Sequence, residues 1–297
     1  MKQLLGKLLK KESEDIGITT EWGIAWRLLR RNSLAMFGLV IVLVLIGTAL
    51  FADVISIYNP NSMILENRLD PPSGTHLLGL DEFGRDILSR IIYGSRISLQ
   101  VGIVVVSISA LIGSLLGAIS GYYGGKIDTI VMRVVDLLLA FPGLILAIAI
   151  MAAIGQSLFN IMFALGLLGW TRYARVVRGQ TLSLREMEYV EAARAAGASS
   201  LRIIFSHILP NCLAPITVLA TLGMASAIMA ESALSFLGLG VSPPTPSWGS
   251  MLTLGRKYLR SAPHVAVFPG IAIMITVLGF NLLGDGLRDA LDPRMRR

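Results

Sequence analysis

The sequence has little charge and almost no cysteine. Asp, Glu, Lys and Arg make up 15% of its 297 residues, whereas an average soluble domain carries about 25%. The single cysteine, Cys212, excludes an intrachain disulfide and leaves the redox compartment open. Hydrophobic residues reach 54%, and the mean hydropathy is +0.69. This composition excludes an ordinary soluble protein and predicts an integral membrane protein.

Signatures of catalysis are also missing. The three histidines, His76, His207 and His264, lie far apart, and no Cys/His cluster has zinc spacing. The segment GYYGGKID at residues 121–128 lacks the G-x-x-x-x-G-K-[ST] pattern of a phosphate-binding loop. The net charge is +7, but the basic residues are not clustered with aromatic ones. We therefore expect no metal site, no ATP hydrolysis by this chain and no nucleic-acid partner.

Long uncharged runs predict an all-α chain with six membrane-spanning helices. About 20 apolar residues cross the hydrocarbon core, and a charge at its centre costs about 2.5–3.5 kcal/mol. One uncharged run, residues 137–171, is too long for a single span, so the turn-forming residues GQSLFN divide it. The predicted spans are Leu34–Ala52, Ile97–Tyr122, Leu137–Ile154, Leu158–Thr171, Ile208–Ala230 and Val265–Gly284.

The distribution of Lys and Arg predicts the orientation of these spans. Nineteen of the 26 basic residues fall on the side that holds both chain ends, and basic residues favour the cytoplasmic side. The expected organisation is a cytoplasmic leader (1–33), a six-span domain (34–284) and a cytoplasmic tail (285–297). Within the domain we expect a cytoplasmic loop at 172–207 and an external loop at 238–263.

The cytoplasmic loop contains a charged helix–Gly–helix stretch, EYVEAARAAGASSLRIIFSHILPN, at residues 188–211. Its alanines favour a helix, Gly197 can end that helix with a positive φ, and Ser199 or Ser200 can cap the next one. Small alanines leave a slim face that could enter a groove on another protein, with Glu188, Glu191 and Arg194 at its rim. The alternative is a plain linker that lies on the lipid headgroups.

The segment EAARAAG, followed ten residues later by ILP, resembles the EAA loop of ABC-importer permeases. Three more stretches resemble the dipeptide/oligopeptide/nickel permease family, and the similarity runs from about Leu34 to the C-terminus. It is closest to the smaller, C-type permease of a two-permease pair. The three stretches are HLLGLDEFGRDILSRIIYGSRISL (76–99), MRVVDLLLAFPGL (132–144) and ESALSFLGLGVSPPTPSWGSML (231–252).

The resemblance implies a type I ABC-importer permease in the inner (plasma) membrane, with both termini cytoplasmic. Such a subunit forms half of a translocation pathway for di- or oligopeptides, nickel or a similar small solute. Its implied partners are a second homologous permease, two ATP-binding subunits that hold ATP and Mg, an extracytoplasmic solute-binding protein and the lipid bilayer. The EAA loop would dock in a cleft of the ATPase subunit. The implied coupling residues are Glu188, Glu191, Ala192, Ala193, Arg194 and Gly197.

Two functions of other classes remain open from the sequence. One is a self-sufficient channel or secondary transporter, although no inverted pair of broken helices is visible. The other is a membrane scaffold that transports nothing, for which the EAA-like loop would be a chance match.

Residues 81–94 are expected to form an amphipathic external helix that Asp81 caps. Asp81/Arg85 and Asp86/Arg90 are spaced as i,i+4 ion pairs on its polar face. This helix could rest on lipid, or it could close the outer mouth and contact a binding protein. In the external loop, Trp248 suits a membrane–water interface and could belong to the same contact.

Glu231 follows 23 uncharged residues, and an intramembrane carboxylate is a functional candidate. It could attract a substrate ammonium or a metal cation, or it could accept backbone N–H groups of the adjoining turn. Pro142 could kink the third span and widen an internal cavity. Arg133 and Asp136, three residues apart, are expected to pair with each other at the inner end of that span.

Overall fold

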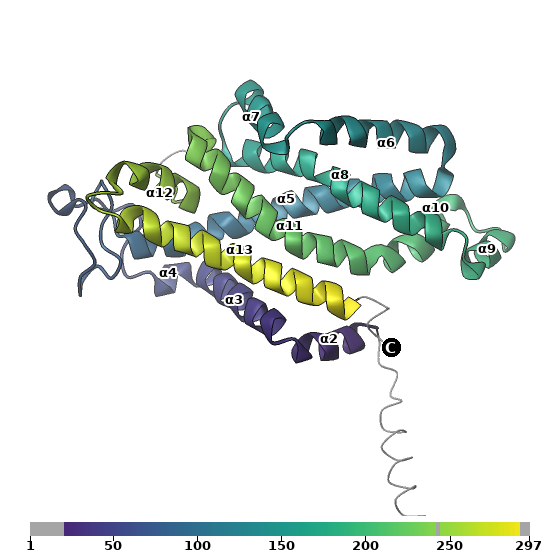
Figure 1. Cartoon of the computed structure of the whole chain (residues 1–297), viewed down its shortest axis with the longest axis horizontal. Helices are drawn as coiled ribbons and strands as arrows, with labels where there is room; N and C mark the ends of the chain where they lie inside the picture. Colours follow the sequence, from purple (N-terminus) through teal and green to yellow (C-terminus); the bar gives the residue numbers. More distant parts are fainter. Residues whose placement is uncertain (1–20, 242–243, 292–297) are drawn as a thin grey trace, which may run out of the picture.

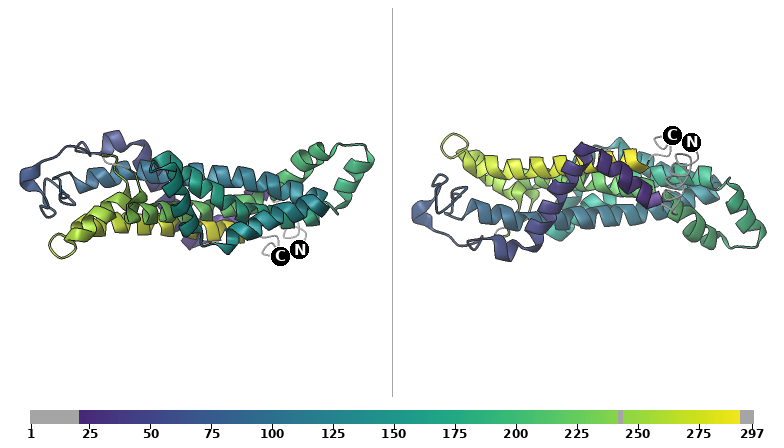
Figure 2. Two further views of the ribbon diagram at one scale, coloured as in Figure 1. Left: turned by 90° about the horizontal axis from the view of Figure 1, so that it is seen from above. Right: turned by 90° about the horizontal axis from the view of Figure 1, so that it is seen from below.

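The computed structural model describes residues 21–241 and 244–291. Within these ranges the chain is helical and holds no strand, only an isolated bridge between Leu80 and Asp86. Five long helices run side by side along the length of the molecule (Figures 1 and 2). They are α3 (Ser33–Leu50), α5 (Ile87–Tyr123), α8 (Leu158–Leu184), α11 (Leu213–Leu234) and α13 (His264–Leu291).

Shorter elements occupy the flank and the two ends of this bundle (Figure 1). The helix α2 (Glu21–Arg31) packs on α13, and α6 (Gly125–Ala140) and α7 (Gly143–Ile154) cover one side. One end, called here the α9 end, carries α9 (Glu188–Ala195) and α10 (Ser200–Ile203). The opposite end, called the α12 end, carries α12 (Trp248–Gly255), α4 (Ala52–Ile55) and the segment 56–86.

Glycines set the close approach of α5 to α8. Gly113, Gly117 and Gly121 recur every four residues on α5, and therefore lie on one face of the helix. A Cβ at Gly117 would lie 2.5 Å from the carbonyl oxygen of Ala174, and one at Gly121 would lie 2.7 Å from the Cβ of Thr181. Small residues of this spacing allow two helix backbones to pack directly in a membrane protein.

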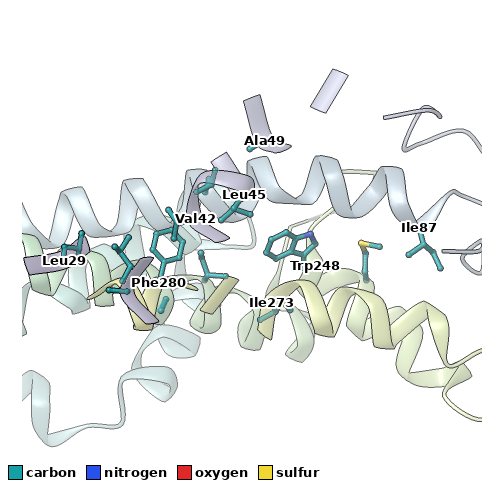
Figure 3. Close-up of a cluster of buried hydrophobic side chains, with 14 of the residues drawn as sticks. Leu29, Val42, Leu45, Ala49, Ile87, Trp248, Ile273 and Phe280 are labelled. Atoms are coloured by element: carbon teal, nitrogen blue, oxygen red, sulfur yellow. The ribbon is translucent and has the colours of Figure 1, made fainter. Parts of the chain in front are cut away.

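The largest hydrophobic cluster joins α3, α13 and the α12 end (Figure 3). Val42 and Leu45 of α3 meet Ile273 and Phe280 of α13, while Trp248 fills the space toward α5. Gly38 lets the two helices touch, because a Cβ there would lie 2.7 Å from the carbonyl oxygen of Gly279. This cluster fixes α12 against the long helices.

Four continuous helical segments are long and apolar enough to cross a membrane among the described residues, and one bent helix pair could form a fifth. The four are 33–50, 87–123, 200–239 and 264–291. The predicted fourth span, Leu158–Thr171, is the first half of α8, whose second half carries three arginines. The all-helical membrane fold is confirmed, but the count of six spans is not reproduced in this form.

The predicted third span, Leu137–Ile154, is wrong as a single helix. The chain turns by 92° between α6 and α7. Pro142 has no N–H to continue the ladder of α6, and the residue before a proline is biased toward extended backbone. Phe141 accordingly has φ −97° and ψ 143°. The predicted kink at Pro142 is therefore a complete break.

Two other predicted boundaries need correction. The separate external helix at 81–94 is wrong, because α5 begins only at Ile87 and runs without interruption to Tyr123. The external loop at 238–263 is not all loop, because it contains α12 and a short 3₁₀ turn, Arg256–Tyr258. In the leader, α2 precedes α3, and the first residues of the tail continue α13 to Leu291.

Candidate functional site

The helix α9 is held to the bundle by one face and leaves the other uncovered. Val190 is fully buried, and it lies in a cluster with residues of α5, α8 and the segment 203–212. Ala193 is half-buried against the same cluster, so it faces inward. Glu188, Glu191 and Ala192 are exposed. The alanine face predicted to enter a groove is therefore divided, with Ala192 outside and Ala193 inside.

The end of α9 has the predicted glycine geometry. Gly197 has φ +81°, the left-handed conformation that favours glycine. The Gly197 N–H donates to the Arg194 carbonyl and the Ala198 N–H donates to the Ala193 carbonyl, each at 3.0 Å. This pair of bonds is a Schellman motif. The Ser199 hydroxyl then caps α10 by accepting from the Arg202 N–H, as the sequence predicted.

The charged side chains of α9 differ in whether they contact another residue of the described chain. The Arg194 guanidinium lies 5.8 Å from the ring centre of Tyr122, at the end of α5. Glu188 and Glu191 lie in the first turn of α9, where the helix dipole favours negative charge. Neither carboxylate forms an ion pair with another residue in the described part of the chain. They are thus available to a cation supplied from outside the chain.

The Asp81 carboxylate organises a turn, not a helix. It accepts hydrogen bonds from the Phe83 N–H and the Arg85 N–H, both at 2.9 Å. Arg85 Nε donates to the same carboxylate at 2.7 Å, so the predicted Asp81/Arg85 pair is confirmed. Arg90 Nε lies 3.5 Å from it. The predicted cap by Asp81 is wrong, because α5 starts six residues later.

Asp86 is the residue that caps α5. Its carboxylate accepts the Ser89 N–H at 2.8 Å, and it lies 2.9 Å from His76 Nδ1. Arg90 instead donates to the Pro60 carbonyl at 2.9 Å. The predicted Asp86/Arg90 pair is therefore wrong, since the helical spacing it assumed begins only at Ile87.

The four charged residues at the start of α5 are all buried, at 2–4% exposure. They connect the segment 56–86 to α5 and form no open surface. This burial does not fit a polar helix face that rests on lipid headgroups, and the contact of Asp81, Arg85, Asp86 and Arg90 with a binding protein stays a prediction. The same network contains Glu82, whose side chain is 9% exposed and whose oxygens accept no hydrogen bond from the described residues. Desolvation raises the pKa of the Glu82 carboxyl.

The Trp248 side chain faces the protein interior. It is 2% exposed, and its indole N–H donates to the Ile91 carbonyl at 2.9 Å. Gly94 makes room for the ring, because a Cβ there would lie 2.6 Å from it. The indole packs on α5 within the largest hydrophobic cluster (Figure 3), so the predicted exposure to a membrane–water interface is wrong, and contact with a binding protein stays a prediction.

Glu231 is fully buried in α11. The Ser235 hydroxyl donates to Glu231 Oε1 at 2.7 Å, and the Ser232 hydroxyl lies 3.5 Å from Oε2. Side-chain hydroxyls therefore supply its hydrogen bonds, in place of the predicted backbone N–H groups. No Lys, Arg or His of the described chain pairs with it. Its attraction for a substrate cation stays a prediction.

A cavity of about 420 Å³ lies between α5, α8, α11 and the α6–α7 bend. Phe141 and Gly143, on either side of Pro142, both contribute to its wall, so the break at the proline shapes the cavity. The wall is mostly apolar, and Arg172 supplies its only ionisable cation among the described lining residues. The polar members of the wall are Ser109, Thr171, Arg172, Tyr173 and Ser226.

Arg172 and Tyr173 were missed by the sequence analysis, which placed Arg172 at the start of the cytoplasmic loop. The signal that could have found them is the helical periodicity of residues 158–184, which continues past Thr171. The other arginines of α8 tie it to α6, because Arg175 pairs with Asp136 at 2.8 Å and Arg178 pairs with Asp128. The predicted Arg133/Asp136 pair is wrong, since Asp136 turns to α8.

The described residues hold no group of three His, Cys, Asp or Glu side chains that could bind a metal ion.

Two protein families match this sequence. Residues 113–297 match the family described as "binding-protein-dependent transport system inner membrane component". Residues 20–72 match the "N-terminal TM domain of oligopeptide transport permease C".

Curated relatives match over nearly their whole length. A dipeptide transport system permease protein of Alkalihalophilus pseudofirmus is 49% identical over 93% of this chain and 90% of its own length. A glutathione transport system permease protein of Pectobacterium atrosepticum is 45% identical, over 95% of this chain and 94% of its own. A putative peptide transport system permease protein of Brucella suis is 48% identical, over 95% of both chains.

A solved structure shares the fold. It is a chain of the MetNI methionine ABC transporter in an inward-facing conformation, matched with a TM-score of 0.54 at 19% identity. The match covers 68% of this chain and 96% of that chain. At this identity the likeness concerns the fold alone.

Proposed function

Because this chain belongs to the family of binding-protein-dependent transport system inner membrane components, we propose that it carries short peptides across the membrane as one of two permease subunits. The observation that carries the peptide assignment is the 45–49% identity, over nearly the full length, to permeases named for dipeptide, peptide and glutathione transport. Nickel, the other solute of the resembled family, stays an alternative prediction.

The energy for transport would come from two ATP-binding subunits that hold ATP and Mg, since this sequence has no phosphate-binding loop. A second permease would complete the pathway, and an extracytoplasmic binding protein would deliver the peptide at the α12 end. The α9 end would face the cytoplasm, and both chain termini would lie on that side.

The helix α9 would be the contact with the ATPase subunit. Its uncovered face carries two carboxylates that pair with no cation of the described residues, at a helix start that projects from the bundle (Figure 1). A buried Val190 and the Schellman end at Gly197 make the helix a rigid projection. Movement of an ATPase cleft would therefore be passed to α5, α8 and α11 through the packed face of α9.

The central test of this contact is Glu191→Ala. A charge-assisted hydrogen bond contributes about 1.5–3 kcal/mol when well formed, so its loss should weaken assembly with the ATPase about tenfold or more. Capture of the ATPase subunit by the permease pair, and ATPase stimulation by the loaded binding protein, would both fall. Glu66→Ala is the control, because Glu66 is an exposed carboxylate at the α12 end. Wild-type capture and stimulation by Glu191→Ala would remove Glu191 from the contact.

Transport itself is tested with the reconstituted complex in proteoliposomes. Uptake of a labelled peptide should require ATP, both permeases and the binding protein. Uptake by this chain alone, without any ATPase, would instead identify a self-sufficient channel or secondary transporter. Absence of transport together with failure to co-purify with an ATPase would favour a membrane scaffold.

A further inference from the structure

An arginine stands directly after the uncharged first half of α8. Arg172 follows the first residue of this helix, Leu158, by fourteen positions. The helical rise places it roughly 21 Å along the helix, a length shorter than the roughly 30 Å thickness of a hydrocarbon core. A charged residue in a membrane-spanning segment is rare and faces a cavity or a partner. Arg172 lines the cavity between α5, α8, α11 and the α6–α7 bend.

Arg172 differs from the other arginines of the same helix. Arg175 and Arg178 each pair with an aspartate of α6. Arg172 has no carboxylate partner in residues 21–241 or 244–291, and its side chain is exposed to the cavity. Its positive charge is therefore uncompensated by the part of the chain that the structure describes.

The neighbouring Tyr173 has a hydroxyl without a partner. The residue is 5% exposed and lines the same cavity, yet its hydroxyl forms no hydrogen bond with any described residue. Gly223 of α11 leaves the space in front of it, because a Cβ there would lie 3.0 Å from the hydroxyl oxygen. A buried hydroxyl without a partner costs free energy that a bound ligand can recover.

We propose that Arg172 and Tyr173 bind the C-terminal carboxylate of the transported peptide. The guanidinium would pair with the carboxylate and the Tyr173 hydroxyl would donate to it. The inference rests on the proposed peptide function, and it adds the group of the substrate that is recognised inside the membrane. Every short peptide with a free C-terminus carries this anion whatever its sequence. The apolar remainder of the wall, formed by residues such as Leu138, Leu168 and Leu222, would accept varied side chains.

The experiment compares trialanine with trialanine amide in the full complex in proteoliposomes. The binding protein is the same throughout, so its own preference cancels when the acid-to-amide uptake ratio of a variant is divided by that of the wild type. Arg172→Gln should raise KM for trialanine about tenfold or more and bring the divided ratio well below one. Arg172→Lys keeps the charge, so its KM for trialanine and its divided ratio should lie between those of the wild type and those of Arg172→Gln. Arg175→Gln, which removes an exposed, paired arginine outside the cavity, is the matched control.

Tyr173→Phe separates a binding role from a structural one. The variant removes only a hydroxyl that has no partner in the described chain, so its thermal unfolding temperature should equal or exceed that of the wild type. Its KM for trialanine should nonetheless rise about tenfold or more, as expected for the loss of one hydrogen bond to a charged group. Loss of thermal stability with unchanged KM would assign Tyr173 a packing role and overturn its part in the inference.

Two results would overturn the proposal in distinguishable ways. If wild-type complex accumulates trialanine and Arg172→Gln keeps the wild-type KM and acid-to-amide ratio, the carboxylate site is wrong while the peptide function stands. If the wild-type complex accumulates no trialanine with ATP and binding protein present, the peptide function fails for this probe, and the carboxylate site fails with it.

Discussion

At the scale of single residues, the α12 end carries a carboxylate in an unfavourable position. Glu82 is nearly buried, and its closest cation, Arg85 Nη2, lies at 3.8 Å without a hydrogen bond. Arg85 Nε instead donates to the neighbouring Asp81 carboxylate at 2.7 Å, and Arg90 Nε lies 3.5 Å from the same carboxylate. Desolvation is the main reason that the pKa of Glu82 is raised above its ordinary value of 4.5.

The raised pKa gives Glu82 a pH-dependent effect on stability. Below about pH 4.5 the carboxyl is protonated in both the folded and the unfolded chain, so the effect is absent. As the pH rises above that value, the unfolded chain releases the proton first, and the folded state becomes relatively less stable. The glutamine of Glu82→Gln is neutral at every pH, so this variant does not lose stability as the pH rises.

Glu82→Gln should therefore unfold at a higher temperature than the wild type at pH 8, and the difference should shrink near pH 4. A shift of about 2–4 °C corresponds to ~1 kcal/mol in a chain of this size. Thermal unfolding of the purified protein in detergent at both pH values measures it. Glu66→Gln is the exposed control and should show no such difference. An equal shift for Glu82→Gln at both pH values would contradict the titration.

Residue-level prediction succeeded where the interaction is local in sequence. Gly197 and Ser199 act within five residues of their own positions, so turn and cap chemistry sufficed. The partner of Arg90 was missed because Pro60 lies 30 residues away, and the contact of Asp86 with His76 was missed because it joins residues ten positions apart across an irregular segment. The burial of Trp248 was missed for the same reason, since Ile91 lies 157 residues away.

At the scale of elements, the α6–α7 bend is the main departure from a regular bundle. The sequence placed a proline in a span but gave no reason for a right-angle turn over a simple kink. The reason is tertiary: ion pairs tie the polar part of α6 to α8, while α7 packs its buried residues Ala147 and Met151 on another part of α8 and α11. Separate contacts thus hold α6 and α7 in place.

Pro142→Ala tests whether the proline holds this bend. A continuous helix from Thr129 to Ile150 would span about 32 Å, whereas two arms at a right angle put the same residues about 22 Å apart. Spin labels at Thr129→Cys and Ile150→Cys, in a Cys212→Ser background, report this distance by pulsed electron resonance. We expect the wild type near the shorter value and Pro142→Ala to populate longer ones, with reduced peptide uptake. An unchanged distance in the variant would show that the contacts of α6 and α7 with α8 and α11 maintain the turn without the proline.

At the scale of the whole molecule, the two ends differ in what they present. The α9 end projects two carboxylates that pair with no described residue, and it rests on a small hydrophobic cluster. The α12 end instead buries four charged side chains where the segment 56–86 joins the start of α5, namely Asp81, Arg85, Asp86 and Arg90. Composition and apolar runs were enough to predict a helical membrane protein, and the motifs were enough to predict its family. The placement of α8 could not be predicted from apolarity, because its three arginines lower the hydropathy of a helix that packs along α5.

The charge distribution predicts that these ends lie on opposite sides of the membrane. Single cysteines at Ser73 and Ser261, both exposed at the α12 end, should react with an impermeant maleimide in intact cells. A cysteine at Ser183, exposed near the α9 end, should react only after permeabilisation. Cys212→Ser serves as the background, since Cys212 is buried. Labelling of Ser183→Cys in intact cells would reverse the orientation.

The interface between α5 and α8 closes late in synthesis. Gly113, Gly117 and Gly121 leave the ribosome with α5, but the residues they contact, such as Ala174, follow roughly sixty residues later, which takes about 3–12 s at 5–20 residues per second. During that interval the bent α6–α7 pair emerges, while the glycine face of α5 has no partner from its own chain. The nascent protein therefore depends on the insertion machinery, or on the lipid, to keep this face from pairing with another newly made helix.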